Sequence, residues 1–210
     1  MSVNLEDFSP YVSELVPECP GFIIEKAVLD AVIEFCQKSY RLNYECDPID
    51  LDEGESLCQV SATGGNSVVG FFDVRYDGDV LDCLSVKEMA GRYGNKWKTR
   101  TGYPVAYLQE NTDTIRIYPI PDKDYPESIT ARVAMSPSRK ATRVDNLFID
   151  FYLEAIKHGA AFRLLMQEGK TWYNPALSDR LRNPFYDALY SARNIVMRDV
   201  YQRRPLPPVI

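Results

Sequence analysis

The stretch GFIIEKAVLDAVIEFCQKSYRLN, residues 21–43, carries the clearest structural signal in the chain. Its polar residues recur every three to four positions, and the opposite side is apolar: Phe22, Ile23, Ala27, Val28, Ala31, Val32, Phe35 and Cys36. This spacing matches an α-helix with a broad apolar face. Pro17 and Pro20 punctuate the approach to it. We therefore predict a strongly amphipathic helix over residues 21–43.

Downstream of this helix, from about residue 45 to 138, the pattern changes to that of strands. Runs rich in β-branched and aromatic residues predict strands at 68–76, 80–84, 105–109, 114–118 and 129–135. Asp77-Gly78-Asp79 is a turn signal between the first two runs. A short helix is expected at about 85–93. Because no long helix separates most of these strands, the sequence favours an antiparallel sheet.

Helical patterns return after Asp145, which is a good N-cap. Residues 146–168 are apolar almost all round, which indicates a helix buried on several sides, with Gly169 as its stop. Asn174-Pro175 predicts the start of a last helix that runs to about Arg203. Asn183-Pro184 predicts a kink or a restart within it.

These elements predict an α+β fold: a helical bundle, with one N-terminal and two C-terminal helices, into which an antiparallel β-sheet is inserted. The predicted boundaries are residues 1–44 with 145–204 for the bundle and 45–144 for the β domain. The proline-rich residues 205–210 are expected to form an extended C-terminal arm.

Composition excludes several classes of protein. The 210 residues are 45% hydrophobic and 26% charged, which is typical of folded globular proteins. No apolar run is long enough for a transmembrane helix, and residues 1–7 predict no signal peptide. Five Cys without a Cys-x-x-Cys pair, and a single His, argue against a disulfide framework and a structural zinc site. We expect a reducing compartment, no cofactor and no metal.

Charge is divided unevenly along the chain. The net charge is −6, with an excess of acids before residue 139 and an excess of bases after it. This asymmetry suggests two surfaces that meet different partners, although solvated helix faces explain it equally well.

No enzyme signature stands out. Gly169-Lys170-Thr171 resembles the end of a phosphate-binding loop, but Leu164 stands where the pattern needs glycine. His158 is the one candidate for histidine catalysis and has no recognisable nucleophile context, so a structural or surface role is favoured. We expect no enzymatic activity.

An acidic cluster surrounds Gly54 and contains Asp47, Asp50, Asp52, Glu53 and Glu55. It matches only part of a calcium loop, because Ser61 stands where the later glutamate is needed. A solvated turn before a strand is the favoured interpretation.

Several short motifs then occur in order along nearly the whole chain: Leu15-Val16-Pro17-Glu18-Cys19-Pro20, Asp47-Pro48-Ile49-Asp50-Leu51, Thr101-Gly102-Tyr103-Pro104, Ile115-Arg116-Ile117-Tyr118-Pro119, Val133-Ala134-Met135-Ser136-Pro137 and Gly169-Lys170-Thr171-Trp172-Tyr173-Asn174-Pro175. This series resembles the head–tail adaptor (connector) proteins of tailed bacteriophages. Pro184 within the last helix departs from that family.

The resemblance implies a structural virion protein of the phage neck, without catalysis, assembled in the host cytoplasm. Members form a ring, commonly a dodecamer, that docks under the portal, joins it to the tail and continues the DNA channel. The implied partners are the portal protein, tail or nozzle proteins, further copies of the chain, and DNA that passes without sequence-specific binding; no membrane is involved.

Two groups of residues are candidates for roles in such a ring. Portal docking is expected from the C-terminal residues Arg203, Arg204, Pro205, Leu206, Pro207, Pro208, Val209 and Ile210. The cluster Asp47, Asp50, Asp52, Glu53 and Glu55 is the candidate for channel-facing acids, because acidic walls give DNA phosphates nothing to bind.

Other functions stay open at this point. A tail terminator or another phage neck or tail ring would stack on the tail tube instead of the portal. A ligand-binding β-module would expose an aromatic groove, and a hydrolase would depend on His158.

Overall fold

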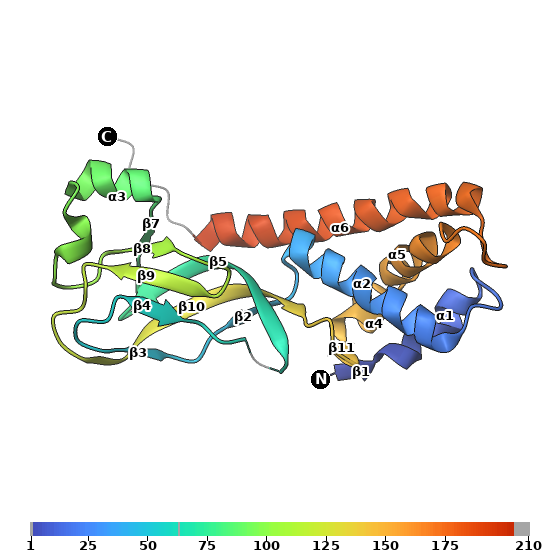
Figure 1. The fold of residues 1–210 in the computed structure, drawn as a ribbon, viewed down its shortest axis with the longest axis horizontal. Coiled ribbons are helices and arrows are strands. Elements are labelled where there is room, and N and C mark those ends of the chain that lie inside the picture. Colours follow the sequence, from blue (N-terminus) through green and yellow to red (C-terminus); the bar gives the residue numbers. More distant parts are fainter. Residues whose placement is uncertain (1, 63, 204–210) are drawn as a thin grey trace. The chain divides into compact units, whose positions relative to one another are not determined.

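A computed structural model of the chain describes residues 2–62 and 64–203 (Figure 1). The chain divides into two compact units. We call the residues up to Arg41 together with those from Ser136 onward the terminal unit, and Leu42–Met135 the central unit. Each unit is described by itself.

Helices dominate the terminal unit. Its elements are β1 (Ser2–Asn4), the 3-10 helix η1 (Leu5–Phe8), α1 (Ser9–Ser13), α2 (Gly21–Ser39), β11 (Arg143–Asp145), α4 (Leu147–Phe151), α5 (Leu153–Leu165) and α6 (Pro175–Arg203). The three long helices α2, α5 and α6 pack against one another (Figure 1). Their shared core includes the fully buried Phe35, Ile156 and Phe185, one from each helix.

The helix ends follow from local chemistry. Tyr40 adopts a left-handed conformation (φ 56°) and donates its backbone N–H to the Cys36 carbonyl at 2.9 Å, so α2 ends at Ser39 instead of residue 43. The predicted 146–168 helix is two helices, α4 and α5, divided at Tyr152. Asn174 accepts the Leu177 N–H at 3.1 Å and thereby caps α6, as Asn174-Pro175 predicts. No restart occurs at Pro184, which lies inside one helix.

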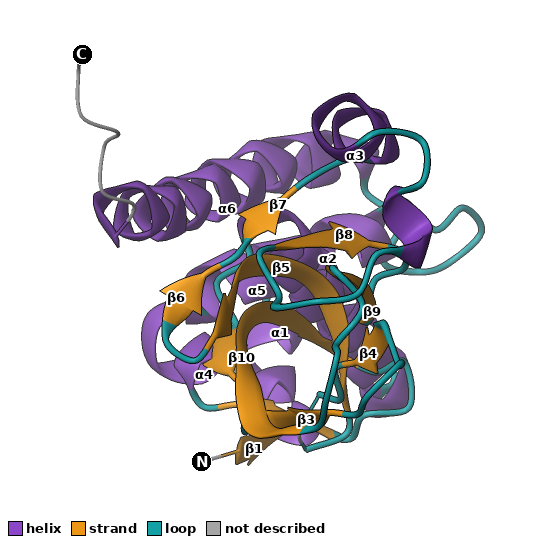
Figure 2. Cartoon of the chain, turned by 90° about the vertical axis from the view of Figure 1, so that its left-hand side faces the viewer, coloured by secondary structure: helices purple, strands orange, loops and turns teal. Residues whose placement is uncertain are grey.

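The central unit holds most of the strands. Its elements are β2 (Asn43–Glu45), β3 (Ile49–Leu51), β4 (Leu57–Gln59), β5 (Asn66–Tyr76), β6 (Asp79–Val80), β7 (Asp82–Cys83), α3 (Val86–Tyr93), η2 (Trp97–Thr99), β8 (Ala106–Gln109), β9 (Thr114–Tyr118) and β10 (Tyr125–Pro137, whose last two residues belong to the terminal unit). One sheet has the order β2-β10-β5-β6 with β3 also on β10, and the other has the order β4-β9-β8-β7. One of the sheets curls into a half-barrel (Figure 2), and the core of the unit includes the buried Val74, Ile115 and Ile129.

Several local predictions are confirmed. Asp77 and Gly78 have positive φ angles of 48° and 88°, which join β5 to β6 through a tight turn. Strand β9 has the predicted bounds, and α3 begins after Ser85 close to its predicted start. Ser85 and Glu88 form a reciprocal capping box, which accounts for this short helix.

The predicted fold class is nevertheless wrong. The described residues form a mixed α/β structure with six α-helices and strands in three sheets, not a helical bundle with one inserted sheet. The terminal unit has its own two-stranded sheet, because Ser2–Asn4 pair with Arg143–Asp145 from far along the sequence. Strands β7 and β8 are parallel, in contrast to the predicted antiparallel arrangement. Residue periodicity indicates a strand but does not say which strand it pairs with.

Candidate interaction surfaces

A groove lies between α2 and the C-terminal half of α5 in the terminal unit, and we call it the α2–α5 groove. Its volume is about 450 Å³, and its lining residues are Phe22, Ile23, Lys26, Ala27, Asp30, Arg163, Leu164 and Gln167. Phe22 has 73% of its surface exposed although it lies on the side of the helix that the sequence pattern marks as apolar. Phe22 is the second residue of α2 and lies at the very start of the helix, beyond the part that neighbouring helices cover.

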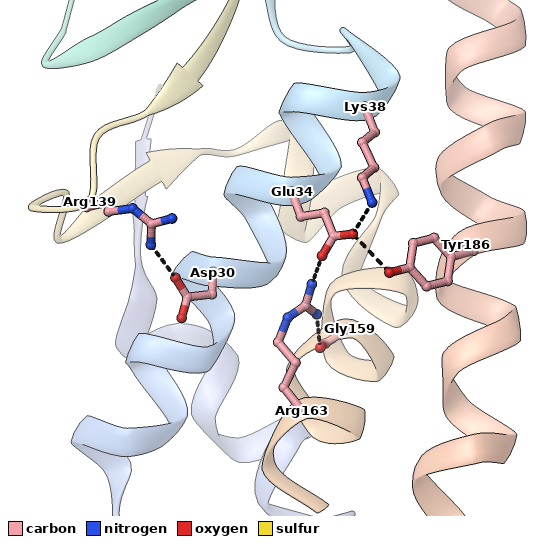
Figure 3. Close-up of polar contacts among 7 residues, drawn as sticks. All are labelled: Asp30, Glu34, Lys38, Arg139, Gly159, Arg163 and Tyr186. Carbon is pink, nitrogen blue, oxygen red and sulfur yellow. Dashed lines mark hydrogen bonds and ion pairs between the residues drawn. The ribbon is translucent and has the colours of Figure 1, made fainter. Parts of the chain in front are cut away.

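A polar network holds the groove's α5 wall against α2 and α6 (Figure 3). Arg163 donates to the Glu34 carboxylate and to the Gly159 carbonyl. The same carboxylate accepts hydrogen bonds from Lys38 Nζ at 2.6 Å and from the Tyr186 hydroxyl at 2.9 Å. Glu34 thus connects the three long helices through one side chain.

Burial by itself would raise the pKa of Glu34, but its partners reverse the effect. The hydrogen bonds from Lys38 and Tyr186 and the positive charge of Arg163 together hold the pKa below its ordinary value. Glu34 is therefore ionised at neutral pH, and Arg163 is already engaged with it. At the groove's other side, Asp30 pairs with Arg139 at 3.1 Å (Figure 3).

A second, more polar hollow of about 690 Å³ borders α6. It is lined by Lys38, Asp179, Arg182, Asn183, Tyr186, Asp187 and Tyr190. Tyr186 and Tyr190 stack with ring centroids 6.3 Å apart, and Tyr190 is 51% exposed. Tyrosines beside charged side chains are typical of protein interfaces, since they bury area and still hydrogen-bond.

Phe151, the last residue of α4, has 76% of its surface exposed. Asp150 beside it and Glu154 in the first turn of α5 are also exposed. We call Asp150, Phe151 and Glu154 the Phe151 knob. The nearly continuous apolar pattern of residues 146–168 predicts burial here, and the prediction is wrong for Phe151 because the chain breaks at Tyr152 instead of continuing one helix.

The five acids proposed from the sequence as channel-facing lie together in the central unit, and all are exposed. The turn before β10 and the start of that strand add further acids to them: Asp50 accepts the N–H of Glu127 in β10 at 2.7 Å, and Asp124 accepts the Glu53 N–H at 2.8 Å. Asp122 belongs to the same turn and accepts the Tyr125 hydroxyl at 2.6 Å. Sequence reasoning missed Asp122, Asp124 and Glu127, because about seventy residues separate them from the cluster.

Other candidate residues occupy structural positions. His158 lies in α5, and its Nε2 atom is 3.8 Å from the Glu154 carboxylate. Burial lowers the pKa of His158, and the charge of Lys157 adds to this effect while Glu154 opposes it. Gly169 has a positive φ of 76° in the turn between α5 and α6, a few residues after the helix ends. Burial raises the pKa of Cys58 to about 11, and the pKa of Cys36 is raised as well, which makes both thiols inert.

Of the residues proposed for portal docking, Arg203 is the last residue of α6. Arg204, Pro205, Leu206, Pro207, Pro208, Val209 and Ile210 lie outside the described residues. The predicted C-terminal arm therefore has no structural description.

Within the part of the chain that the structure describes, no three His, Cys, Asp or Glu side chains are grouped so that they would hold a metal ion. The described helices include none with the length and apolar character needed to cross a membrane. No protein-family model matches the chain, and no curated protein matches it either.

Proposed function

We propose that this chain is a structural protein of a tailed bacteriophage: a ring-forming head–tail adaptor that docks under the portal, joins it to the tail and continues the DNA channel. The proposal rests on the resemblance of the ordered sequence motifs. The structural observation that carries it further is the presence of large exposed apolar side chains on separate surfaces of the terminal unit.

Those exposed side chains favour assembly over catalysis. Phe22 and Phe151 are each about three-quarters exposed, at 73% and 76%, and they lie on different helices. Single exposed apolar residues are ordinary, but an exposed aromatic beside a preformed groove is typical of a binding surface. Two different surfaces on one chain are what a ring requires, because each copy contacts one neighbour on each side.

The acidic turns of the central unit suit the DNA channel. Asp122, Asp124 and Glu127 extend the cluster of Asp47–Glu55, so the exposed acids gather from two segments. A surface of this charge repels phosphates and forms none of the counterion-releasing contacts by which Lys and Arg hold DNA. In the proposed ring, such a surface would let DNA move past without binding.

Affinity-tagged protein recovered from cells that assemble the particle, and measured by native mass spectrometry, tests the proposal. We expect a ring of copies in complex with a portal protein, and the mass gives the copy number. Recovery with tail-tube protein alone would assign the chain to the tail terminators. A monomer with no virion component would overturn the proposal and leave a ligand-binding β-module to be tested on a glycan array.

A hollow that the described residues of the central unit line is a candidate ligand site for such a module. Its volume is about 420 Å³, and its described lining residues are Gln59, Val60, Ser61, Ala62, Asn66, Ser67, Val68, Thr112 and Asp113. None of these is aromatic, whereas stacking on aromatic rings is the feature expected of the alternative.

A further inference from the structure

We propose that copies of this chain associate head to tail, with the Phe151 knob of one copy seated in the α2–α5 groove of the next. The inference rests on the proposed function, since it names the contact that would build the ring.

The knob has the properties of an anchor. Phe151 projects 76% of its surface into solvent, and full burial of an aromatic ring removes about 150–250 Å² from water. It ends a short helix, α4, whose second residue, Phe148, is buried in the core, so the ring is presented from a fixed base. A preorganised aromatic of this kind loses little conformational entropy on binding.

The groove has the properties of a receptor. Its volume of about 450 Å³ lies within the range of sites that enclose a ligand group, and Phe22, Ile23 and Leu164 supply apolar walls. Phe22 is 73% exposed in the single chain, and an incoming ring would cover it. Aromatic pairs of this type gain energy beyond the buried area alone.

Charge selects the occupant. Asp30 is paired with Arg139, and Arg163 is paired with Glu34, which leaves the exposed Lys26 as the charge that the groove offers to a partner. The knob carries Asp150 and Glu154 on either side of its ring in the sequence. The C-terminal residues of a neighbouring copy suit the groove less well, because Arg203 and Arg204 would bring like charge to Lys26.

Geometry makes the contact intermolecular. Phe151 of the knob precedes the first turn of α5, whereas Arg163 and Leu164 line the groove from its last turn. The 13 residues of α5 span about 20 Å, so a copy's own knob does not reach its own groove. A contact between two different surfaces is heterologous, and it repeats around a ring when the rotation closes.

Disulfide trapping tests the contact directly. In a Cys83→Ser background, which removes the one exposed native thiol, a chain with Glu154→Cys, which keeps the Phe151 ring and Asp150, is mixed at high concentration with a differently tagged chain carrying Gln167→Cys. Gln167 lines the groove without supplying its charge or its apolar walls. We expect a mixed disulfide-linked dimer, and little product from either chain alone.

The matched control replaces Glu154→Cys with Val86→Cys, at an apolar residue of the central unit that is 55% exposed. Its yield with Gln167→Cys should be about tenfold lower. Equal yields, or a dominant homodimer of Glu154→Cys, would overturn the head-to-tail contact.

Charge exchange supplies a second readout that does not depend on new cysteines. Lys26→Glu and Asp150→Lys should each weaken self-association about tenfold in sedimentation equilibrium, and the double variant should recover most of the loss. Phe151→Ala, an exposed substitution that leaves the core intact, should weaken it about 30-fold. Independent, additive losses in the double variant would overturn the pairing.

The two proposals fail separately. Portal-bound rings that form normally with Phe151→Ala would overturn this contact and leave the adaptor function standing. If the crosslinks form but the protein is never recovered together with a virion component, the contact stands and the adaptor function is overturned.

Discussion

Gly159 of α5 lies directly against the ring of Phe185 of α6. A β-carbon at residue 159 would stand 2.6 Å from ring atoms Cδ2 and Cε2 of Phe185, and 3.1 Å from the β-carbon of Ala31 on α2. All three residues are buried, so the three long helices pack against one another at a place where this glycine leaves room. Glycine inside a helix costs about 1 kcal/mol relative to alanine, and this close packing is its physical reason.

Gly159→Ala should therefore destabilise the protein, although the substitution favours the helix itself. The methyl group forces the buried Phe185 ring to shift, and overpacking of this kind costs about 1–3 kcal/mol, more than the gain in helix propensity. Urea unfolding monitored by circular dichroism measures the difference. Gly91→Ala in α3 is the matched control, because a β-carbon there meets nothing within 4 Å, and it should stabilise by about 0.5–1 kcal/mol.

Glu34→Gln should lower the free energy of unfolding by about 1–3 kcal/mol at neutral pH. The substitution removes the charge that Arg163 and Lys38 share, and Arg163 is only 21% exposed, so solvent replaces the lost partner poorly. Chemical denaturation of the two proteins side by side gives the value. Glu168→Gln, at an exposed position, should change stability very little, and a loss there equal to that of Glu34→Gln would contradict the assignment.

The same residue predicts a pH dependence. The pKa of Glu34 is lower in the folded chain than its ordinary value of 4.5, so the unfolded chain binds its proton first as the pH falls. The contribution of Glu34 is fully present above about pH 4.5 and is lost as the pH falls through the folded pKa. The difference between wild type and Glu34→Gln should thus shrink when unfolding is measured at pH 4 and below instead of pH 7.

His158 predicts an effect at higher pH. Burial lowers its pKa from the ordinary 6.5, although Glu154 opposes this, so the folded chain keeps the imidazole neutral where the unfolded chain protonates it. Stability due to this group is present above about pH 6.5 and falls as the pH drops below it. His158→Gln should reduce the loss of thermal stability between pH 7.5 and 5.5. An unchanged pH profile in this variant would show that other groups account for the dependence.

Asp50 serves the fold as well as the charge of its cluster. Its carboxylate accepts the Glu127 N–H at 2.7 Å, and Glu127 has a strained positive φ of 48°. Asp50→Ala should cost about 1 kcal/mol, because it leaves the backbone N–H of Glu127 without its acceptor, whereas Asp50→Asn keeps an acceptor oxygen and should be nearly neutral. Thermal unfolding of both variants checks the difference, and equal losses would contradict the role of the hydrogen bond.

The amide replacements also test the channel role of the acidic cluster. Particles assembled with Asn or Gln at Asp47, Asp50, Asp52, Glu53 and Glu55 should form but release DNA more slowly, because repulsion of phosphates is lost. The rate of DNA release in vitro is the measurement. Glu168→Gln is again the control and should leave the rate of DNA release unchanged. A normal rate of DNA release in the variant with all five replacements would contradict the proposal that these acids face the channel.

Much of the local structure could be predicted from the sequence. The period of apolar residues in 21–43 predicts the helix that becomes α2, and Asp77-Gly78 predicts the turn between β5 and β6. These signals depend on residues close in sequence, whose side chains share a face or fit one turn. The candidate surfaces could not be predicted in the same way. Apolar spacing predicts that Phe22 and Phe151 are core residues, but both are exposed.

Most helices and strands, and roughly where each begins and ends, follow from neighbouring residues alone, because backbone conformation responds to neighbours within a few positions. Tertiary structure alone decided which strands pair, including Ser2–Asn4 with Arg143–Asp145 and the parallel pair β7 and β8. The tertiary structure also determines that the Phe185 ring packs against Gly159, and that Phe151 is exposed while Phe148 is buried. The physical reason is that burial and pairing depend on which distant surfaces meet, and that is set by the packing of the whole unit.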